Sequence, residues 1–406
     1  MADPVRESPT NLHDRSGGAN RPQTTPPEFS TDHFALKLGF FYAAYFFFGG
    51  VQLPFFPLWL EARGLETGMI GLVIAVPTVM RIVATPVITR QADRRAALKS
   101  ALVIGSIVGV CAMTLVGLAE GAIAILIVFV IAMTALAPML PLADAYALNG
   151  LGVRGRSYGP VRLWGSVAFI AGNVGAGLAL ELIAPGHLIW LLVASLAMVV
   201  AAAVALTPLD TARPPPGART ASPSSLIRNP AFLAVALAGG LIQSSHALYY
   251  GFSVLQWRSA GLSGPIIGLL WGLAVLAEVV LFAYSARLPR ALTPTMLLAI
   301  GGAGAAIRWT AMAFDPPTAV LPLLQLLHAC SFGAAHLGAM AFLARAVPKE
   351  LAATAQGFVA TLSGIISAAA LAASGLVYAA SGSLAYLVMA GMALVGLLSA
   401  LYAGRR

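Results

Sequence analysis

Seven ionisable side chains lie inside long apolar stretches of a 406-residue chain, where a charge is costly. They are Arg81, Asp144, Arg162, Glu278, Arg308, His328 and His336. Carboxyl and imidazole groups exchange protons, whereas a guanidinium stays charged and binds a carboxylate with two parallel hydrogen bonds. In an apolar environment such groups normally face one another or a water-filled cavity, and they mark ion and substrate pathways. The residue types therefore predict proton exchange and anion binding inside an apolar body.

The composition identifies that body as a membrane protein. Hydrophobic residues make up 59% of the chain and charged residues 10%, and the mean hydropathy is +0.86. Because a soluble domain has about 25% charged residues, this chain cannot cover a folded surface with water-compatible groups. The two cysteines, Cys111 and Cys330, are too few for a disulfide framework or a cysteine-rich metal site. No metalloprotease, serine-hydrolase or paired-cysteine motif occurs, so we expect no enzyme, no cofactor and no metal site.

Apolar runs long enough to cross a bilayer form two sets of six. The approximate runs are 34–60, 68–89, 98–118, 121–147, 158–181 and 187–207, then 229–257, 265–288, 293–313, 317–343, 351–378 and 383–402. This pattern predicts an all-α membrane protein with twelve transmembrane helices in two pseudo-symmetric six-helix bundles. We expect a disordered cytoplasmic tail at 1–33, an N-terminal bundle at 34–207, a cytoplasmic linker at 208–228 and a C-terminal bundle at 229–406.

The basic residues are distributed asymmetrically about these spans. With the tail placed in the cytoplasm, nineteen of the 24 Lys and Arg residues lie on the cytoplasmic side and two, Arg63 and Arg258, on the other. An excess of Lys and Arg marks cytoplasmic loops, so both termini are expected in the cytoplasm, in a bacterial-type inner (plasma) membrane. The net charge of +9 then needs no nucleic-acid partner. The expected partners are protons, a small-molecule substrate and the lipid bilayer, and the protein is expected to be a monomer.

A short sequence match relates the two halves. Residues 64–71, after the first span, correspond to residues 261–268, after the seventh, at a constant offset of 197. The same offset places Arg81 opposite Glu278. A repeated six-helix unit predicts a pseudo-two-fold axis along the membrane normal, a site near the midplane between the halves, and alternating access by rocking.

Spacing from each turn predicts which side chains share a depth in the membrane. Asp144 and Arg162 each lie nine residues from position 153, so we expect them at one level, either as a substrate-binding ion pair or as a purely structural clamp. Glu278 and Arg308 are equally far from the turn between their helices.

The same counting extends to the tenth span. Arg308 and His328 each lie ten residues from position 318, so they are expected at the level of Glu278. His336 lies eight residues beyond His328, about 12 Å further along a helix. A fixed ion pair of Glu278 and Arg308 that moves as one body remains an alternative to proton exchange.

Several motifs resemble those of a known transporter family. They are Pro54-Phe-Phe-Pro-Leu-Trp-Leu, Ala143-Asp-Ala, Tyr158-Gly-Pro-Val-Arg-Leu-Trp-Gly-Ser, Arg308-Trp and Gln325-Leu-Leu-His-Ala-Cys-Ser-Phe-Gly-Ala-Ala-His. On these residues the chain from 34 to 402 resembles the major facilitator superfamily. Within it the chain is similar to the branch of lactose permease, the nucleoside–proton symporters and, most closely, the 3-phenylpropionate permease type.

The resemblance to lactose permease implies roles for the residues at matching positions. Asp144 and Arg162 would bind the substrate, and Glu278, Arg308 and His328 would handle protons. Two departures matter. The second carboxylate of the tenth helix is replaced by Ser331, so proton coupling needs another group or is absent.

The second departure concerns the loop between the second and third spans. The superfamily usually has Gly four residues before an Asp in this loop, whereas Thr89 precedes Asp93 here. The basic residues Arg94 and Arg95 are retained, so we expect Asp93, Arg94 and Arg95 to act in gating, with a plain topogenic loop as the alternative.

The charge balance inside the spans favours an anionic substrate. With neutral His, three Arg and two carboxylates leave a net charge of +1, and a buried guanidinium without an anion is costly. Arg162 or Arg308 is expected to bind a carboxylate, with Arg81 also in the cavity. Further candidate substrate contacts are Gln325, Tyr42, Tyr45, Trp164 and Phe169.

We therefore expect proton-coupled import of a small organic acid such as an arylpropionate. Glu278 is the expected proton carrier, His328 relays its state, and His336 is a further proton-coupling candidate. The alternatives are a sugar or nucleoside proton symporter, a metabolite or drug exporter, and a membrane-embedded receptor.

Overall fold

The computed structural model describes residues 33–209, 224–289, 291–348 and 351–405. The chain divides into two units, Met1–His33 and Phe34–Arg406, and every helix of the described residues lies in the second. The expected tail lies outside the described residues except for His33, and so does most of the expected linker.

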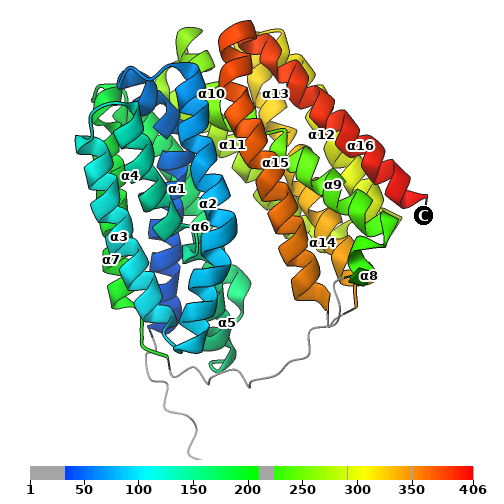
Figure 1. Ribbon diagram of the computed structural model, residues 1–406, viewed down its shortest axis with the longest axis horizontal. Coiled ribbons are helices and arrows are strands. Elements are labelled where there is room, and N and C mark those ends of the chain that lie inside the picture. The colour runs from blue at the N-terminus through cyan, green and yellow to red at the C-terminus, as the bar shows by residue number, and fades with distance from the viewer. Residues whose placement is uncertain (1–32, 210–223, 290, 349–350, 406) are drawn as a thin grey trace, which may run out of the picture. The chain divides into compact units, whose positions relative to one another are not determined.

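The described residues contain helices and no strand. The helices of the first part are α1 Phe34–Ala62, α2 Thr67–Arg94, α3 Leu98–Leu118, α4 Ala122–Leu136, α5 Met139–Gly152, α6 Tyr158–Ala179, η1 Pro185–His187, α7 Leu188–Ala205 and α8 Ser224–Ile227. Those that follow are α9 Pro230–Ser244, α10 Ala247–Ser259, α11 Gly264–Tyr284, η2 Ser285–Arg287, α12 Pro294–Ala313, η3 Thr318–Val320, α13 Leu321–Leu326, η4 Ala329–Ala334, α14 Ala335–Ala346, α15 Ala352–Ser381, η6 Gly382–Ala385 and α16 Tyr386–Gly404 (Figure 1).

Eleven helical stretches of the described chain are long and apolar enough to cross a membrane. The last stretch, Thr354–Gly404, contains two helices, α15 and α16, separated by the short turn η6. The turn begins at Gly382, whose φ of +55° is a conformation that glycine adopts without strain. The chain is therefore an all-helical membrane protein.

Three of these stretches are interrupted near their middle. One breaks between α4 and α5, at Ala137 and Pro138, and another between α9 and α10, at Ser245 and His246. The third contains a π-helical turn, η4, between α13 and α14. Interrupted helices inside a membrane are tolerated where neighbouring groups satisfy the freed backbone, and they are common at binding sites.

The interruptions expose backbone groups to side chains of other helices. The carbonyl of Leu136, at the end of α4, accepts the Tyr45 hydroxyl at 3.4 Å. The carbonyl of Phe332, within η4, accepts the Gln243 amide of α9 at 3.3 Å. The break after α4 is thus tied to α1, and the π-helical turn η4 is tied to α9.

Helices distant in sequence approach closely at one end of the helical unit. α2 packs along α15, and α6 along α11 (Figure 1). At the first crossing a Cβ on Gly71 would lie 3.0 Å from the backbone of Gly375, and at the second a Cβ on Gly177 would lie 2.3 Å from the carbonyl oxygen of Gly264. Only glycine allows backbones to come this close. We call the end of the unit that holds these two crossings the closed end.

The two loops matched in sequence have the same local structure. Gly64 and Gly261 have φ of +79° and +85°. In each loop the following residue donates its backbone N–H to a carbonyl five residues earlier, Leu65 to Leu60 and Leu262 to Trp257. This is the arrangement of a glycine-terminated helix, and it explains why both loops begin with Gly-Leu.

Candidate functional site

A cavity of about 640 Å³ lies among α1, α2, α4, α5, α6, α10 and α15. Its aromatic lining residues are Tyr45, Phe46, Phe48, Phe129, Phe169 and Tyr250. Its polar lining residues are Gln52, Thr78, Thr85, Thr361 and the charged Arg81. Among the described residues that line the cavity, Arg81 alone is charged. A largely apolar wall with several aromatic rings and a single guanidinium suits a ligand that has an apolar ring and a negative group.

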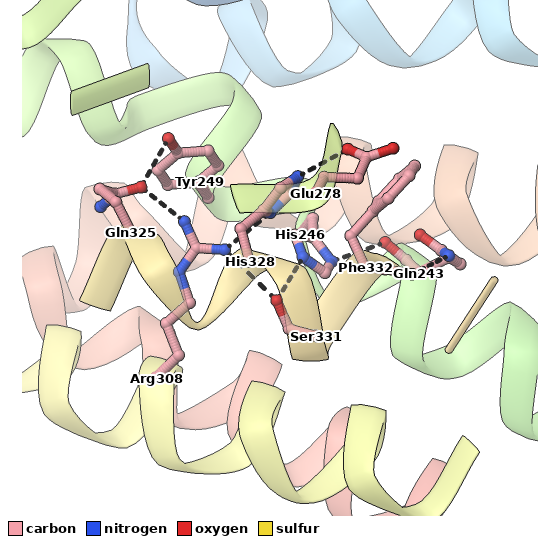
Figure 2. A network of polar contacts seen from close by, with 9 residues as sticks. All are labelled: Gln243, His246, Tyr249, Glu278, Arg308, Gln325, His328, Ser331 and Phe332. Carbon is pink, nitrogen blue, oxygen red and sulfur yellow. Dashed lines mark hydrogen bonds and ion pairs between the residues drawn. The ribbon is translucent and has the colours of Figure 1, made fainter. Parts of the chain in front are cut away.

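A buried polar network surrounds Arg308 of α12 (Figure 2). Its Nη2 donates to Gln325 Oε1 at 2.7 Å, and its Nη1 lies 3.0 Å from His328 Nδ1. Nη1 also donates to Ser331 Oγ at 3.4 Å. The Tyr249 hydroxyl donates to the same Gln325 oxygen at 3.0 Å. The network therefore joins α10 and α12 to the interrupted span that contains α13 and η4.

The Arg308 guanidinium has aromatic and neutral neighbours. Its Cζ lies 4.6 Å from the ring centres of both Tyr249 and Trp309, and its side chain is fully buried. No carboxylate of the described chain lies within ion-pair distance of it. Glu278 lies beyond His328, with 3.6 Å between Glu278 Oε2 and His328 Nε2. A buried cation without a direct anion is costly, so this region favours the arrival of negative charge.

Arg308 also determines the tautomer of His328. A guanidinium has only donors, so the Nδ1 that faces it accepts and carries no proton. The ring proton is then on Nε2, which faces Glu278 (Figure 2). A second proton on His328 would place two donors against each other. Within this group Glu278 is the side chain that can change its protonation state without such a clash.

Equal spacing from the turns placed Glu278, Arg308 and His328 at one level, and the structure brings these three side chains together. His336, two helical turns further along, is outside the network. Its ring lies 6.1 Å from the ring of Phe282 and 6.4 Å from that of Phe332.

The expected ion pair of Asp144 and Arg162 does not form in the described structure. Asp144 Oδ1 instead accepts the hydroxyl of Tyr42 at 2.6 Å and that of Tyr158 at 2.7 Å. The Arg162 guanidinium lies 4.0 Å from the centre of the Phe46 ring and 5.5 Å from that of Tyr42. Equal depth on neighbouring helices fixes the height of two side chains but not the direction in which each points.

The remaining predicted substrate contacts lie in three different places. Arg81, Tyr45 and Phe169 line the cavity, whereas Gln325 belongs to the Arg308 network. Trp164 is 60% exposed and is not among the residues that line the cavity.

The three predicted gating residues lie at the C-terminal end of α2, where Asp93 and Arg94 are its last two residues and Arg95 follows. The side chains of Asp93, Arg94 and Arg95 are exposed. With its amide oxygen oriented toward Arg95, Gln91 accepts from that guanidinium at 2.9 and 3.0 Å. The contact between Gln91 and Arg95 thus ties the last turn of α2 to the residue that follows the helix.

One ionisable residue of the spans is absent from the predicted set. His246, at the break between α9 and α10, is fully buried, and its Nε2 lies 3.2 Å from Ser331 Oγ. An imidazole inside an apolar run is the same signal that identified His328 and His336, so the sequence contains the information. Its contacts with Trp309 and Ser331 can be seen only in the folded structure.

Comparison with known proteins assigns the chain to a family. The model of the MFS_1 like family matches residues 35–388. The chain belongs to this family of the major facilitator superfamily. The match extends from the second residue of α1 into the beginning of α16, and every residue that lines the cavity or belongs to the Arg308 network lies within it. The major facilitator superfamily consists of transporters, so this MFS protein is a transporter and not an enzyme.

Two curated relatives of this MFS transporter are described as a transporter and a permease. It is 33% identical over 315 residues to a protein of Escherichia coli (strain K12) described as a probable 3-phenylpropionic acid transporter, covering 76% of this chain and 81% of the relative. It is 28% identical over 326 residues to a maltose permease of Geobacillus stearothermophilus, covering 78% and 80%.

Solved MFS structures share the fold. The nucleoside transporter NupG matches with a TM-score of 0.77 at 17% identity, covering 92% of this chain and 99% of that one. A bacterial homologue of the human lysosomal transporter Spinster, solved in an inward-facing and unoccupied conformation, matches with a TM-score of 0.69 at 14% identity, covering 94% and 98%. At these identities the likeness concerns the fold alone.

Proposed function

We propose that this transporter imports a small organic acid, such as an arylpropionate, together with protons. The observation that supports the proposal most directly is the cavity wall, which contains six aromatic residues and one charged residue, Arg81. The relative described as a probable 3-phenylpropionic acid transporter supports the same substrate class. An aryl ring would pack among Tyr45, Phe46 and Phe169, and the carboxylate would pair with Arg81.

The topology of the proposal has twelve crossings in two six-helix bundles, 34–207 and 229–406, with both termini in the cytoplasm. The bias of Lys and Arg supports this orientation. It places the closed end, with its Gly71–Gly375 and Gly177–Gly264 contacts, on the outer side. Gly357, which lines the cavity, has no neighbouring atom within 4 Å of its Cβ position, which favours an opening toward the cytoplasm.

The transport cycle would then move the cavity between the two sides by rocking of the bundles. Asp93, Arg94 and Arg95 would lie at the cytoplasmic gate, and a single chain would suffice for transport. Arg162 and Arg308 would attract the substrate carboxylate as the cavity closes, since both lie near aromatic rings rather than carboxylates.

Glu278 would carry the proton. Its side chain is 18% exposed, and its nearest ionisable contact is the neutral His328. A protonated Glu278 leaves Arg81, Arg162 and Arg308 in excess over Asp144, which favours binding of an anion. Release of the proton restores the negative charge and favours release of the anion, so the two movements are coupled.

A sugar or nucleoside symporter is the second candidate. The maltose permease relative and the four uncharged polar residues of the cavity wall favour it. Substrate selectivity separates the two, because a neutral polyol needs no guanidinium.

A thermal-shift comparison of matched ligands tests the proposed substrate class. We expect 3-phenylpropionate to raise the unfolding temperature of the purified protein, because a ligand that binds the folded state at 100 times its Kd adds about 2.7 kcal/mol of stability. The matched control is 3-phenylpropionamide, which keeps the ring and chain but lacks the charge, and it should give little shift. Equal shifts with the acid and the amide, or a shift with maltose or a nucleoside alone, would contradict the proposal.

A further inference from the structure

His246 is a buried imidazole that the proposed transport cycle does not yet use. It lies at the break between α9 and α10, has no exposed surface, and packs 5.3 Å from the ring of His328 and 4.9 Å from that of Trp309. Its two ring nitrogens face different partners (Figure 2). The difference between these partners determines which ring nitrogen of His246 carries the proton.

The backbone fixes the proton on His246 Nδ1. That nitrogen lies 3.2 Å from the carbonyl oxygens of both Ile242 and Gln243, which only accept. Nε2 is therefore the acceptor of the ring, and its partner at 3.2 Å is the hydroxyl of Ser331. Ser331 must donate its single proton to His246.

The direction of that bond determines what Ser331 offers to Arg308. Because its proton points at His246, only lone pairs of Ser331 Oγ remain for the guanidinium Nη1 at 3.4 Å. Gln325 Oε1 and His328 Nδ1 are the other two acceptors. The guanidinium is thus surrounded by three neutral acceptors on one side of the span that contains α13 and η4.

This arrangement keeps Arg308 apart from Glu278. The ring of His328 stands between them, with Nδ1 on the Arg308 side and Nε2 on the Glu278 side. A guanidinium in direct contact with a carboxylate strongly favours the charged carboxylate. Proton exchange at Glu278 therefore requires that Arg308 stay with its neutral acceptors.

We infer that His246 is a positioning residue for proton coupling, which orients the Ser331 hydroxyl so that Arg308 is held away from Glu278. The inference rests on the proposed proton-coupled transport and adds a residue and a role to it. His246 and Ser331 thereby present Arg308 with a neutral, oriented acceptor.

The other charged or titratable groups near the site do not orient the Ser331 hydroxyl in this way. The charged or titratable groups that face Glu278 are His328, Tyr250 from α10 and, within electrostatic range, Arg162 from α6. Those that face His246 are His328, Arg308 and Tyr250. Of these, none contacts Ser331 Oγ except Arg308.

The test is a pH titration of the protonated-carboxyl infrared band in the full-length protein without substrate. The band of Glu278 is assigned by its loss in Glu278→Gln. His246→Leu removes the acceptor, Arg308 moves toward Glu278, and the midpoint of the band is expected to fall by about one pH unit, as for a carboxylate that gains a nearby cation. His246→Gln provides an amide oxygen to Ser331 and is expected to titrate as the wild type does.

Ser331→Ala interrupts the same connection with a smaller change in packing, and it is expected to lower the midpoint in the same direction. A wild-type midpoint in both His246→Leu and Ser331→Ala would overturn the inference, and so would a midpoint in His246→Gln equal to that of His246→Leu. Failure of the proposed function is a separate result, because it is seen as absence of proton-driven uptake by the wild type whatever the infrared midpoints are.

Discussion

Glu278→Gln is expected to abolish accumulation of an organic acid against its gradient while leaving substrate exchange intact. Gln has nearly the shape of Glu and keeps an oxygen facing His328 Nε2, so the binding site is preserved. It cannot take up or release a proton, so a pH gradient can no longer drive transport. Uptake into proteoliposomes under an imposed pH gradient measures the first property, and counterflow without a gradient measures the second.

The matched control for this variant is Glu120→Gln. Glu120 is an exposed carboxylate in the connection between α3 and α4, away from the cavity. It should accumulate substrate as the wild type does. Gradient-driven accumulation by Glu278→Gln at the wild-type level would show that another group carries the proton.

Arg81→Gln is expected to raise the half-saturation concentration for a carboxylate substrate by about 10- to 100-fold. Arg81 is the charged lining residue of the cavity, and a hydrogen bond to a charged group contributes about 1.5–3 kcal/mol, where 1.4 kcal/mol corresponds to a factor of ten. Arg81→Lys keeps the charge but loses the two parallel hydrogen bonds, so its loss should be smaller. Concentration dependence of counterflow gives the three values.

Arg90→Gln is the matched control, because Arg90 is exposed on the same helix and does not line the cavity. Its half-saturation concentration should equal that of the wild type. An unchanged half-saturation concentration for Arg81→Gln would indicate that the carboxylate binds at Arg162 or Arg308. The ligand would then bind deeper than the cavity that Arg81 lines.

The sequence was most informative about depth. Short connections between antiparallel spans make the distance from a turn a good measure of height, and this placed Glu278 and Arg308 beside His328. The glycine pattern was similarly reliable, because Gly64 and Gly261 terminate helices in a conformation that few other residues adopt.

The sequence does not predict how each helix is rotated about its axis, and this rotation determines the partners of Asp144. Its carboxylate faces Tyr42 and Tyr158, while Arg162 faces aromatic rings. An apolar run has many polar neighbours at one height, and only packing selects among them.

Two of the three breaks within spans were also not predictable. No proline or glycine marks the interruption at Ser245 and His246, and nothing in Ala329–Ala334 distinguishes a π-helical turn from a regular helix. These irregularities present His246 and Ser331 to each other. Local sequence signals for a helix end are weak when tertiary hydrogen bonds satisfy the freed backbone.

The central claim is that the protein couples import of an organic acid to protons, and one measurement tests it most directly. Proteoliposomes containing the wild-type protein are placed in a medium more acidic than their interior, and labelled 3-phenylpropionate is added to that medium. The account predicts protein-dependent accumulation above the level reached in protein-free liposomes, with loss of that excess when a protonophore collapses the gradient. Protein-dependent uptake of the same size with and without the gradient, or none at all, would contradict it.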